Sequence, residues 1–292
     1  MSSLHFICNP VAGNGASKTT FEAMEALLRE RGVEYTSVFT EYPGHARQLA
    51  REALAAGHAC IVAVGGDGTV REVAEEMAGF SVPMGILPAG TGNDMARPLR
   101  IPQDPRAALD ILQNGKTVRM DAAQVNGKLF FNVGGLGFDV DVLLNTERYK
   151  KNHRGMTAYI LGLLSALIHL KQLHVRVTTP EGTRAYKAIM VVVCNGTHFG
   201  GGMNVAPLAD TSDGLFDVCV AHDVNRFTLL FLLAKFIKGK HVGLRVIDYF
   251  KAAEVSVACT SEAPIQVDGE VVSSTPAAFR ILPGALLVKT GM

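Results

Sequence analysis

The sequence predicts a two-domain protein: an N-terminal α/β domain with a parallel sheet and helices on both faces, then a β-rich sandwich domain with inserted helices. Short apolar runs alternate with helical segments in the first third of the chain, which is typical of a parallel sheet. Strand-like segments dominate after Asp121. The chain has 292 residues, of which 48% are hydrophobic, and this length can bury two cores. We therefore expect domains at residues 1–121 and 122–278.

Four apolar runs in the first domain have the length and composition of buried strands. Helices are expected between them, from about residue 18 to 31 and from 44 to 56, and each ends at a glycine, which favours a helix C-terminus. Right-handed crossovers would make the sheet parallel, with ligands bound beyond the carboxyl ends of its strands. The four predicted strands cover residues 4–8, 35–40, 60–64 and 84–87.

Two glycine-rich turns follow neighbouring strands at that edge. One reads Gly65-Gly66-Asp67-Gly68-Thr69 and the other Pro88-Ala89-Gly90-Thr91-Gly92-Asn93-Asp94. Glycine lets the backbone approach a phosphate closely, and amides at the following helix N-terminus attract it. Asp67 can face a phosphate only through a hard cation such as Mg²⁺, because like charges repel. One such turn is often an ordinary tight turn, but two of them one strand apart predict a nucleotide with its metal ion.

A third turn, Asn9-Pro10-Val11-Ala12-Gly13, leaves the first strand at the same edge. It is not a Walker A loop, because that loop needs a glycine immediately before Lys18 and this chain has Ser17. An Asn-Pro dipeptide is also a common strand exit, so turn chemistry alone does not assign it to a ligand.

Cap and turn residues predict the elements of the second half. Asp104-Pro105 opens a helix that stops at Gly115, and Val125-Asn126-Gly127-Lys128 predicts a two-residue hairpin. Helices are expected at residues 155–170 and 226–237. Strands are expected at residues 130–133, 174–179, 188–194, 216–221, 254–258 and 265–267.

Charge and cysteine usage limit the function classes. A net charge of +1 at pH 7 argues against a general nucleic-acid-binding protein. The five cysteines lie in apolar runs without Cys-x-x-Cys spacing, so we expect buried free thiols rather than disulfides or a zinc site. The N-terminus lacks the basic start and apolar segment of a signal peptide, and we expect a cytoplasmic protein.

The two most apolar helical segments, residues 157–170 and 228–236, are too short to span a bilayer. Such helices can rest on an anionic membrane, here its inner face, or pack against the core with solvated lysines at their ends. The sequence does not decide between these two interpretations, and it is also compatible with a homodimer. The flanking basic residues are Arg148, Lys150, Lys151, Arg154, Lys235, Lys238, Lys240 and Arg245.

Taken together, the turns 65–69 and 88–94 resemble the signature of the diacylglycerol kinase catalytic domain family. This family includes diacylglycerol, sphingosine and ceramide kinases and bacterial soluble lipid kinases. Gly-Gly-Asp-Gly alone also occurs in NAD kinases and phosphofructokinases, and the second turn makes the resemblance specific. The resemblance implies the two-domain architecture described above and a last segment, residues 279–292, that returns to the first domain.

The resemblance also implies catalytic and nucleotide-binding roles. Asp268 matches the family's proposed general base, which would accept the proton of the acceptor hydroxyl, and Asp67 would act through the metal ion. Glu270 matches an acidic residue close to the nucleotide. The other residues implied to bind the nucleotide are Asn9, Gly66, Thr69 and Thr91.

A second set of acidic residues is implied to hold metal ions. Asp213 matches a residue that binds a structural Mg²⁺, with the backbone carbonyls of Asp210 and Leu215 as further ligands. Asp94 and Asp121 would complete an acidic network around the catalytic metal ion, although Asp94 could equally cap the following helix.

The resemblance therefore implies an ATP- and Mg²⁺-dependent lipid kinase that transfers the γ-phosphoryl group to a lipid hydroxyl such as that of diacylglycerol. A membrane lipid is then the expected partner. Two alternatives stay open at this point. One is an NAD kinase-like enzyme with a soluble substrate, and the other is a catalytically silent module that binds lipid or nucleotide.

Overall fold

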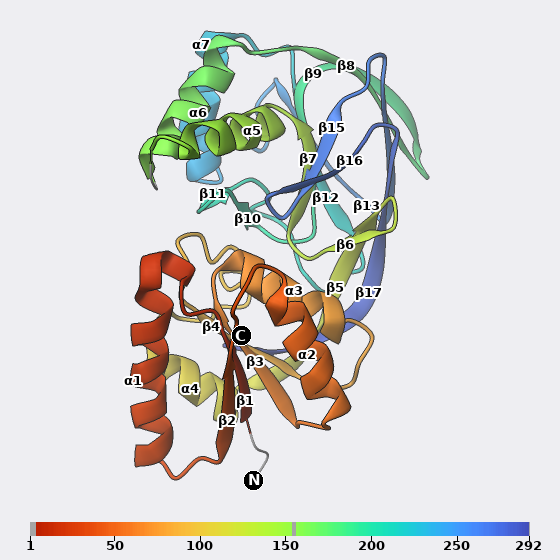
Figure 1. Cartoon of the computed structure of the whole chain (residues 1–292). Helices are drawn as coiled ribbons and strands as arrows, with labels where there is room; N and C mark the ends of the chain where they lie inside the picture. The colour runs from red at the N-terminus through yellow and green to blue at the C-terminus, as the bar shows by residue number, and fades with distance from the viewer. Residues whose placement is uncertain (1–3, 154–155, 292) are drawn as a thin grey trace.

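Strand β17 (Ala277–Thr290) links the two parts of the molecule, which are seen one above the other in Figure 1. The structure is a computed structural model and describes residues 4–153 and 156–291. The second half of β17 pairs antiparallel with β5 (Lys116–Val125) and, at Val288, parallel with Met84 of β4. The boundary expected near Asp121 falls inside β5, and the domain limits stay a prediction.

The N-terminal domain is a parallel sheet covered on both faces. Helices α1 (Ala16–Glu30) and α4 (Pro105–Asn114) share one apolar core with the sheet, and α2 (His45–Ala55) and α3 (Asp67–Met77) share another. This confirms the α/β fold class predicted from the alternating pattern. A 3₁₀ turn, η1 (Ala12–Gly15), precedes α1. The sheet order is β2 (Tyr35–Phe39), β1 (Leu4–Cys8), β3 (Cys60–Gly65), β4 (Met84–Pro88).

The second domain is rich in antiparallel strands and carries three helices on one side. Helices α5 (Phe138–Lys150), α6 (Met156–Ile168) and α7 (Arg226–Ile237) gather at one side of the upper domain in Figure 1. Two apolar clusters fill this domain. Its further strands are β6 (Lys128–Phe130), β7 (Val133–Gly137), β8 (Leu173–Thr179), β9 (Gly182–Cys194), β10 (His198–Phe199), β11 (Met203–Asn204), β12 (Phe216–His222), β13 (Ile247–Ala252), β14 (Glu254–Cys259), β15 (Pro264–Val267) and β16 (Glu270–Ser274).

The sequence analysis misplaced one strand of this domain and missed several other elements. The strand expected at residues 130–133 is split between β6 and β7, because the amides of Phe131 and Asn132 donate to Asp268 instead of to a ladder. Helix α5 was not predicted. Its buried side includes the polar residues Asp139 and Thr146 while Leu144 is exposed, so apolar residues do not mark the buried face, and Gly137 before it adopts φ 102°. Strands β10, β11, β13 and β16 were also missed. Gly155, the first residue of the predicted helix, and the flanking Arg154 lie outside the described residues.

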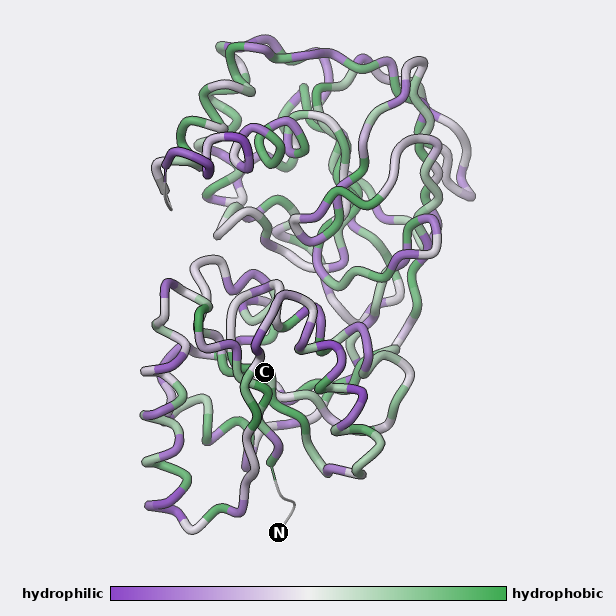
Figure 2. Tube along the Cα trace, in the orientation of Figure 1, coloured by the Kyte–Doolittle hydropathy of each residue, from purple (hydrophilic) through white to green (hydrophobic). Residues whose placement is uncertain are grey.

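Hydrophobic residues follow the central strands of both domains and also run along α6 (Figure 2). Of the five free cysteines, Cys8, Cys60, Cys194 and Cys219 are buried as expected, whereas Cys259 is half-buried. Within residues 4–153 and 156–291, no helix has both the length and the apolar character needed to cross a bilayer.

Candidate active site

All three predicted turns meet beyond the carboxyl ends of the parallel strands and line one pocket of about 440 Å³. The Asn9 side chain donates from Nδ2 to Thr69 Oγ1 at 3.0 Å, and its Oδ1 accepts from the Val11 amide at 3.2 Å. This hydrogen bond joins the turn 9–13 to the turn 65–69. The pocket is lined by Asn9, Val11, Ala12, Gly13, Thr40, Glu41, Tyr42, Pro43, Gly44, Ala46, Gly66, Gly68, Thr69, Glu72, Gly90 and Thr91.

Glycine is required where the turns 65–69 and 88–94 approach each other. A Cβ added to Gly90 would lie 2.4 Å from Gly66 Cα, and one added to Gly92 would lie 2.6 Å from Asp67 Oδ2. Both distances are far below van der Waals contact: the first is to backbone, and the second is to a carboxylate whose other oxygen accepts from the Asp94 amide. The two turns therefore form a narrow backbone cradle of the kind that suits a phosphate chain.

Asp67 and Asp94 form a carboxylate pair at the end of this cradle. Asp67 is the first residue of α3, and its Oδ1 accepts from the Asp94 amide at 2.6 Å. Asp94 Oδ2 accepts from the Gly201 amide of the second domain at 3.0 Å. Asp94 Oδ1 is buried and accepts no hydrogen bond from the described residues, with Arg97 Nε 3.8 Å away. Burial, with Asp67 nearby, raises the pKa of Asp94 to about 6.

A buried carboxylate oxygen without a donor is a place where a hard cation fits. Among the described residues, no group of three or more His, Cys, Asp or Glu side chains is arranged to hold a metal ion. A Mg²⁺ ion at Asp67 and Asp94 would therefore have to complete its shell with phosphate oxygens and water, as such ions commonly do in nucleotide sites.

Asp268 lies at the tip of the β15–β16 turn with φ 45°. Its Oδ1 accepts from the amides of Asn132 and Val133 at 3.0 Å each, and its Oδ2 accepts from the Phe131 amide at 2.8 Å. Despite these three donors, burial raises the pKa of Asp268 to about 6. A carboxylate oxygen has two lone pairs, so Oδ2 keeps one with which to accept a substrate proton.

Arg71 connects the two domains at this site. Its Nη1 donates to Glu75 Oε1 at 2.9 Å, and its Nη2 makes a short contact with Glu270 Oε1 of the β16 strand. Arg71 is buried and follows Asp67 by one turn of α3, while Glu270 follows Asp268 by two residues. Sequence reasoning missed Arg71. Its spacing of four residues from Asp67, on the same helix face, was the available signal.

The residues assigned to a structural metal ion form a separate cluster around Asp121. The Asp121 carboxylate accepts from the amides of Gly214 and Gly284 at 2.8 and 2.7 Å. It therefore supports the loop of Asp210, Asp213 and Leu215, whereas Asp94 lies with Asp67. Asp213 Oδ2 lies 2.5 Å from Lys251 Nζ, and Asp213 Oδ1 accepts from the Leu215 amide at 3.0 Å.

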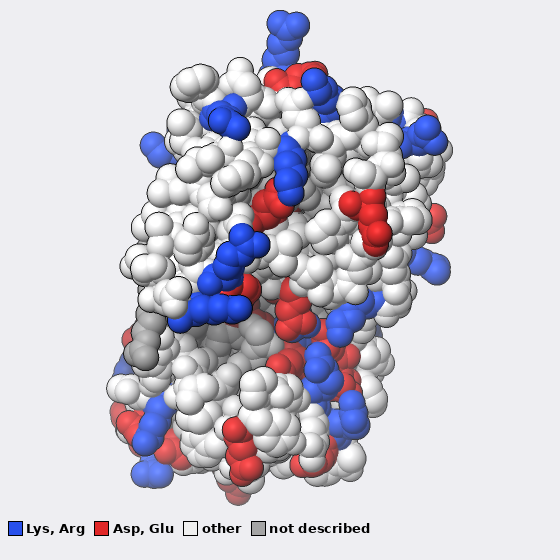
Figure 3. All heavy atoms as spheres, turned by 45° about the horizontal axis from the view of Figure 1, so that its top comes forward, with Lys and Arg blue, Asp and Glu red and all other residues white. Residues whose placement is uncertain are grey.

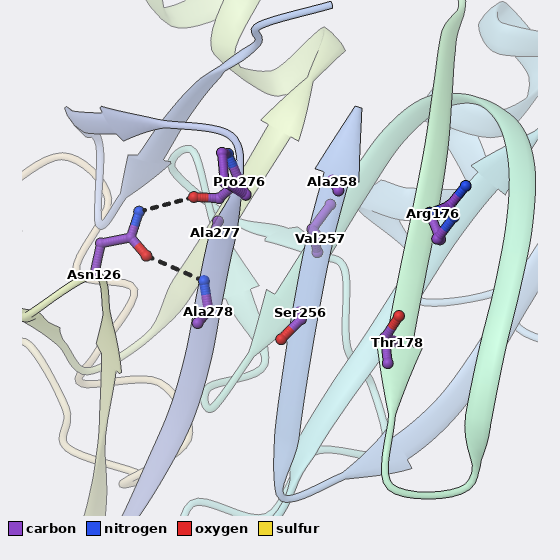
Figure 4. A pocket seen from close by; sticks show the side chains of 9 residues that line it. All are labelled: Asn126, Arg176, Thr178, Ser256, Val257, Ala258, Pro276, Ala277 and Ala278. Carbon is purple, nitrogen blue, oxygen red and sulfur yellow. Dashed lines mark hydrogen bonds between the residues drawn. The ribbon is translucent and has the colours of Figure 1, made fainter. Parts of the chain in front are cut away.

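A hollow between the two domains is visible in Figure 3, with basic side chains along one lip and acidic side chains beside it. A shallower hollow of about 340 Å³ lies over β8, β14 and β17 (Figure 4). There Asn126 donates to the Pro276 carbonyl at 3.2 Å and accepts from the Ala278 amide at 3.1 Å, so its amide group is already used. Arg176 is the one charged residue that lines this second hollow, which offers no comparable chemistry.

A glycine-rich phosphate cradle with paired carboxylates, opposite a carboxylate turn of a β-rich domain, is the arrangement of a two-domain phosphotransferase. The sequence model of the diacylglycerol kinase catalytic domain matches residues 3–125, and that of the YegS C-terminal NAD kinase beta sandwich-like domain matches residues 133–290. The chain belongs to the diacylglycerol kinase family that combines these two domains, and it is a lipid kinase.

Similar proteins cover almost the whole chain. A "Diacylglycerol kinase" of Mycobacterium tuberculosis is 34% identical over 290 residues, covering 97% of this chain and 93% of the relative. A "Probable lipid kinase YegS-like" protein of Pseudomonas aeruginosa is 36% identical over 282 residues, covering 94% and 91%. The crystal structure of a diacylglycerol kinase from Bacillus anthracis has a TM-score of 0.74 at 22% identity, covers 99% of this chain and 97% of its own, and shows the shared fold.

Proposed function

We propose that this lipid kinase uses ATP and Mg²⁺ to phosphorylate a lipid hydroxyl such as that of diacylglycerol. The observation that supports it most is the Asp67–Asp94 pair at the end of the backbone cradle, where one buried carboxylate oxygen accepts no hydrogen bond from the residues that the structure describes. Asn9, Gly66, Thr69 and Thr91 would hold the nucleotide phosphates, since all four line the pocket. When bound, Mg²⁺ would neutralise phosphate charge as it develops during transfer.

Asp268 would accept the proton of the lipid hydroxyl. Its three backbone donors fix the carboxylate in one orientation, and Oδ2 retains a lone pair for the incoming hydroxyl. The Arg71–Glu270 ion pair would hold the Asp268 turn beside α3 and thus beside Asp67. Proton acceptance and phosphate positioning would in this way come from different domains that act on one substrate.

The proposal is tested by incubating the purified protein with labelled ATP and single acceptors. Diacylglycerol in mixed micelles, other lipid alcohols, NAD and a no-acceptor control should be compared, because the C-terminal domain is of an NAD kinase-like kind. We expect a labelled phospholipid that requires Mg²⁺ and disappears in Asp67→Asn. Labelled NADP without labelled lipid would favour the NAD kinase-like alternative. Absence of ATP consumption with every acceptor would favour a binding module.

We also propose that helix α7 rests on an anionic membrane that supplies the lipid. Asn225 caps this helix by accepting from the Thr228 amide, and Leu229, Leu232 and Phe236 face the core. The opposite face is also apolar: Phe227 is 85% exposed and Ile237 is 61% exposed. That outward stripe consists of Phe227, Leu230, Phe231, Ala234 and Ile237, spaced by three or four residues.

The charges around the exposed stripe of α7 support an anionic membrane as its partner. Lys235 Nζ lies 5.1 Å from the centroid of the Phe231 ring, and Arg226 and Lys238 are exposed at the two ends of the helix. An apolar stripe bordered by cations matches an anionic bilayer surface. The neighbouring helix α6 adds a similar exposed row, Ile160, Leu164 and Ile168.

Liposome flotation tests the membrane proposal. Binding should increase with anionic lipid and fall in Phe231→Glu, whereas Phe80→Glu should bind like the wild type, because Phe80 is similarly exposed but lies in the N-terminal domain. Flotation that ignores anionic lipid, or equal losses in both variants, would contradict it. A dimer in solution that Phe231→Glu dissociates would assign the stripe to a second copy of the chain.

A further inference from the structure

Several hydrogen bonds to protein groups brace the loop that precedes β12. The Asp121 amide donates to the Thr211 carbonyl at 2.7 Å, and the Gly214 amide donates back to the Asp121 carboxylate. Asp210 Oδ1 accepts from the amide and hydroxyl of Ser212, at 3.0 and 2.7 Å. Asp213 Oδ1 accepts from the Leu215 amide. The backbone of this loop therefore has internal partners at each of these positions.

A lysine already occupies the cation position of this loop. Lys251 on β13 is the cross-strand partner of Asp217 on β12. Its Nζ lies 2.5 Å from Asp213 Oδ2 and 3.5 Å from Asp217 Oδ2. Asp217 is completely buried, and its other oxygen accepts from the Tyr249 hydroxyl at 2.7 Å. The ammonium group therefore hydrogen-bonds to Asp213 and forms a longer ion pair with Asp217, whose buried Oδ2 accepts no hydrogen bond from the described residues.

We propose that the Lys251 ammonium is the built-in cation of this loop, so that the loop needs no divalent ion. The family resemblance implied a structural Mg²⁺ on Asp213, and the carboxylate here does not fit one. Mg²⁺ requires oxygen ligands at about 2.0–2.1 Å in octahedral geometry. To bind it, Asp213 would have to release Lys251, or else the ammonium and a divalent ion would have to share one carboxylate pair, where their like charges repel.

The buried carboxylate explains why a lysine suits this position. An ionised group without water is strongly destabilised unless a counter-charge lies beside it. Asp217 has its counter-charge in Lys251, which lies directly opposite on the neighbouring strand. The same ammonium then anchors Asp213 and, through it, the whole loop. This inference concerns the loop alone and does not depend on which lipid is phosphorylated.

The first test uses the nucleotide-free wild type. Purified protein should carry no stoichiometric divalent metal by elemental analysis, and its melting temperature should not change with a chelator. If added Mg²⁺ raises the melting temperature slightly, that increase should disappear in Asp67→Asn, at the candidate catalytic position, and persist in Asp213→Asn. A bound divalent ion whose removal lowers the melting temperature in the wild type, but not in Asp213→Asn, would overturn the proposal.

The second test removes the ammonium. Lys251→Ala should melt at a lower temperature, because Asp213 and Asp217 are left facing each other, and millimolar Mg²⁺ or Ca²⁺ should restore part of the loss. Lys251→Ala combined with Asp213→Asn should lose that recovery. The control is Lys187→Ala, an exposed lysine on the adjacent strand β9. If divalent ions raise the melting temperature of Lys251→Ala no more than that of the control, the proposal is wrong. If Lys251→Ala does not fold, the wild-type measurement decides alone.

Discussion

Replacing Asp268 with asparagine separates the two tasks that the structure gives to this carboxylate. The side chain fixes the 131–133 segment through three backbone amides, and it is the candidate proton acceptor. Asparagine keeps the shape and one acceptor oxygen but cannot take up a proton at neutral pH. Structural and catalytic roles therefore respond differently to this one substitution.

The structural cost follows from the hydrogen bonds. A carboxamide oxygen in place of Oδ1 can still accept from Asn132 and Val133, whereas an NH₂ group in place of Oδ2 faces the Phe131 amide. One orphaned donor costs about 1–3 kcal/mol of folding free energy. Asp268→Ala would orphan three donors, a loss comparable to the total stability of about 5–15 kcal/mol that is typical of a domain. Alanine is therefore the less informative substitution.

The catalytic cost is expected to be much larger than the structural one. A positioned general base contributes about 10²–10⁴-fold to the rate, and kcat of Asp268→Asn should fall within that range. ATP affinity should stay within about twofold of the wild-type value, because the nucleotide pocket is lined by the other domain. Phosphoryl transfer to lipid, ATP binding by calorimetry and urea denaturation measure the three quantities. A stability loss of the expected size with kcat within about threefold of wild type would show that Asp268 only braces the loop.

Three further changes test other parts of the site. Burial raises the pKa values of Asp94 and Asp268 to about 6, so kcat should fall as the pH drops through 6 and the base becomes protonated, which a pH-rate profile measures. The folded-state pKa values of both carboxylates lie above the unfolded value of 3.8, so their contribution to stability should increase as the pH falls through 6 and be lost as the pH rises. Asp94→Asn should therefore make the melting temperature depend less on pH. Gly92→Ala should reduce kcat/KM at least about tenfold, because its Cβ meets Asp67 Oδ2 at 2.6 Å. The control is Gly57→Ala, at φ 77° in open space, which should cost about 1 kcal/mol of stability and leave kcat unchanged. Equal kinetic losses in the two variants would contradict the backbone cradle. Arg71→Ala should lower stability by about 2–3 kcal/mol and also lower kcat. The control is Arg47→Ala, which also removes an ion pair with Glu75 but none with Glu270 among the described contacts, and it should affect stability alone. Unchanged kcat in Arg71→Ala would refute the role of Arg71 in positioning the Asp268 turn.

Local chemistry made the fold and part of the site predictable from sequence. The strand–turn–helix pattern around Asp67 and the hairpin at Asn126-Gly127 depend on neighbouring residues, and the structure shows both, with Asn126 and Gly127 at positive φ. What could not be read locally depends on distant partners. The amides that hold Asp268 come from residues more than 130 positions earlier, and Arg71 meets a glutamate 199 positions away. Helix α5 was missed for a related reason, since the surrounding domain buries its polar residues Asp139 and Thr146 and leaves Leu144 exposed, so its apolar pattern does not mark the buried face.

The spacing between the two candidate catalytic carboxylates depends on the contacts that join the domains. Asp67 begins α3 and Arg71 lies one turn later, while Asp268 occupies the turn that leads to Glu270. The Arg71–Glu270 pair therefore links the element that carries one carboxylate to the element that carries the other. Glu270 is 55% exposed, so solvent weakens this ion pair, whereas Arg71 itself is buried and held by Glu75. Two sets of contacts therefore hold the Asp268 turn in place: the backbone amides of residues 131–133 within its own domain, and the Arg71–Glu270 pair across the junction.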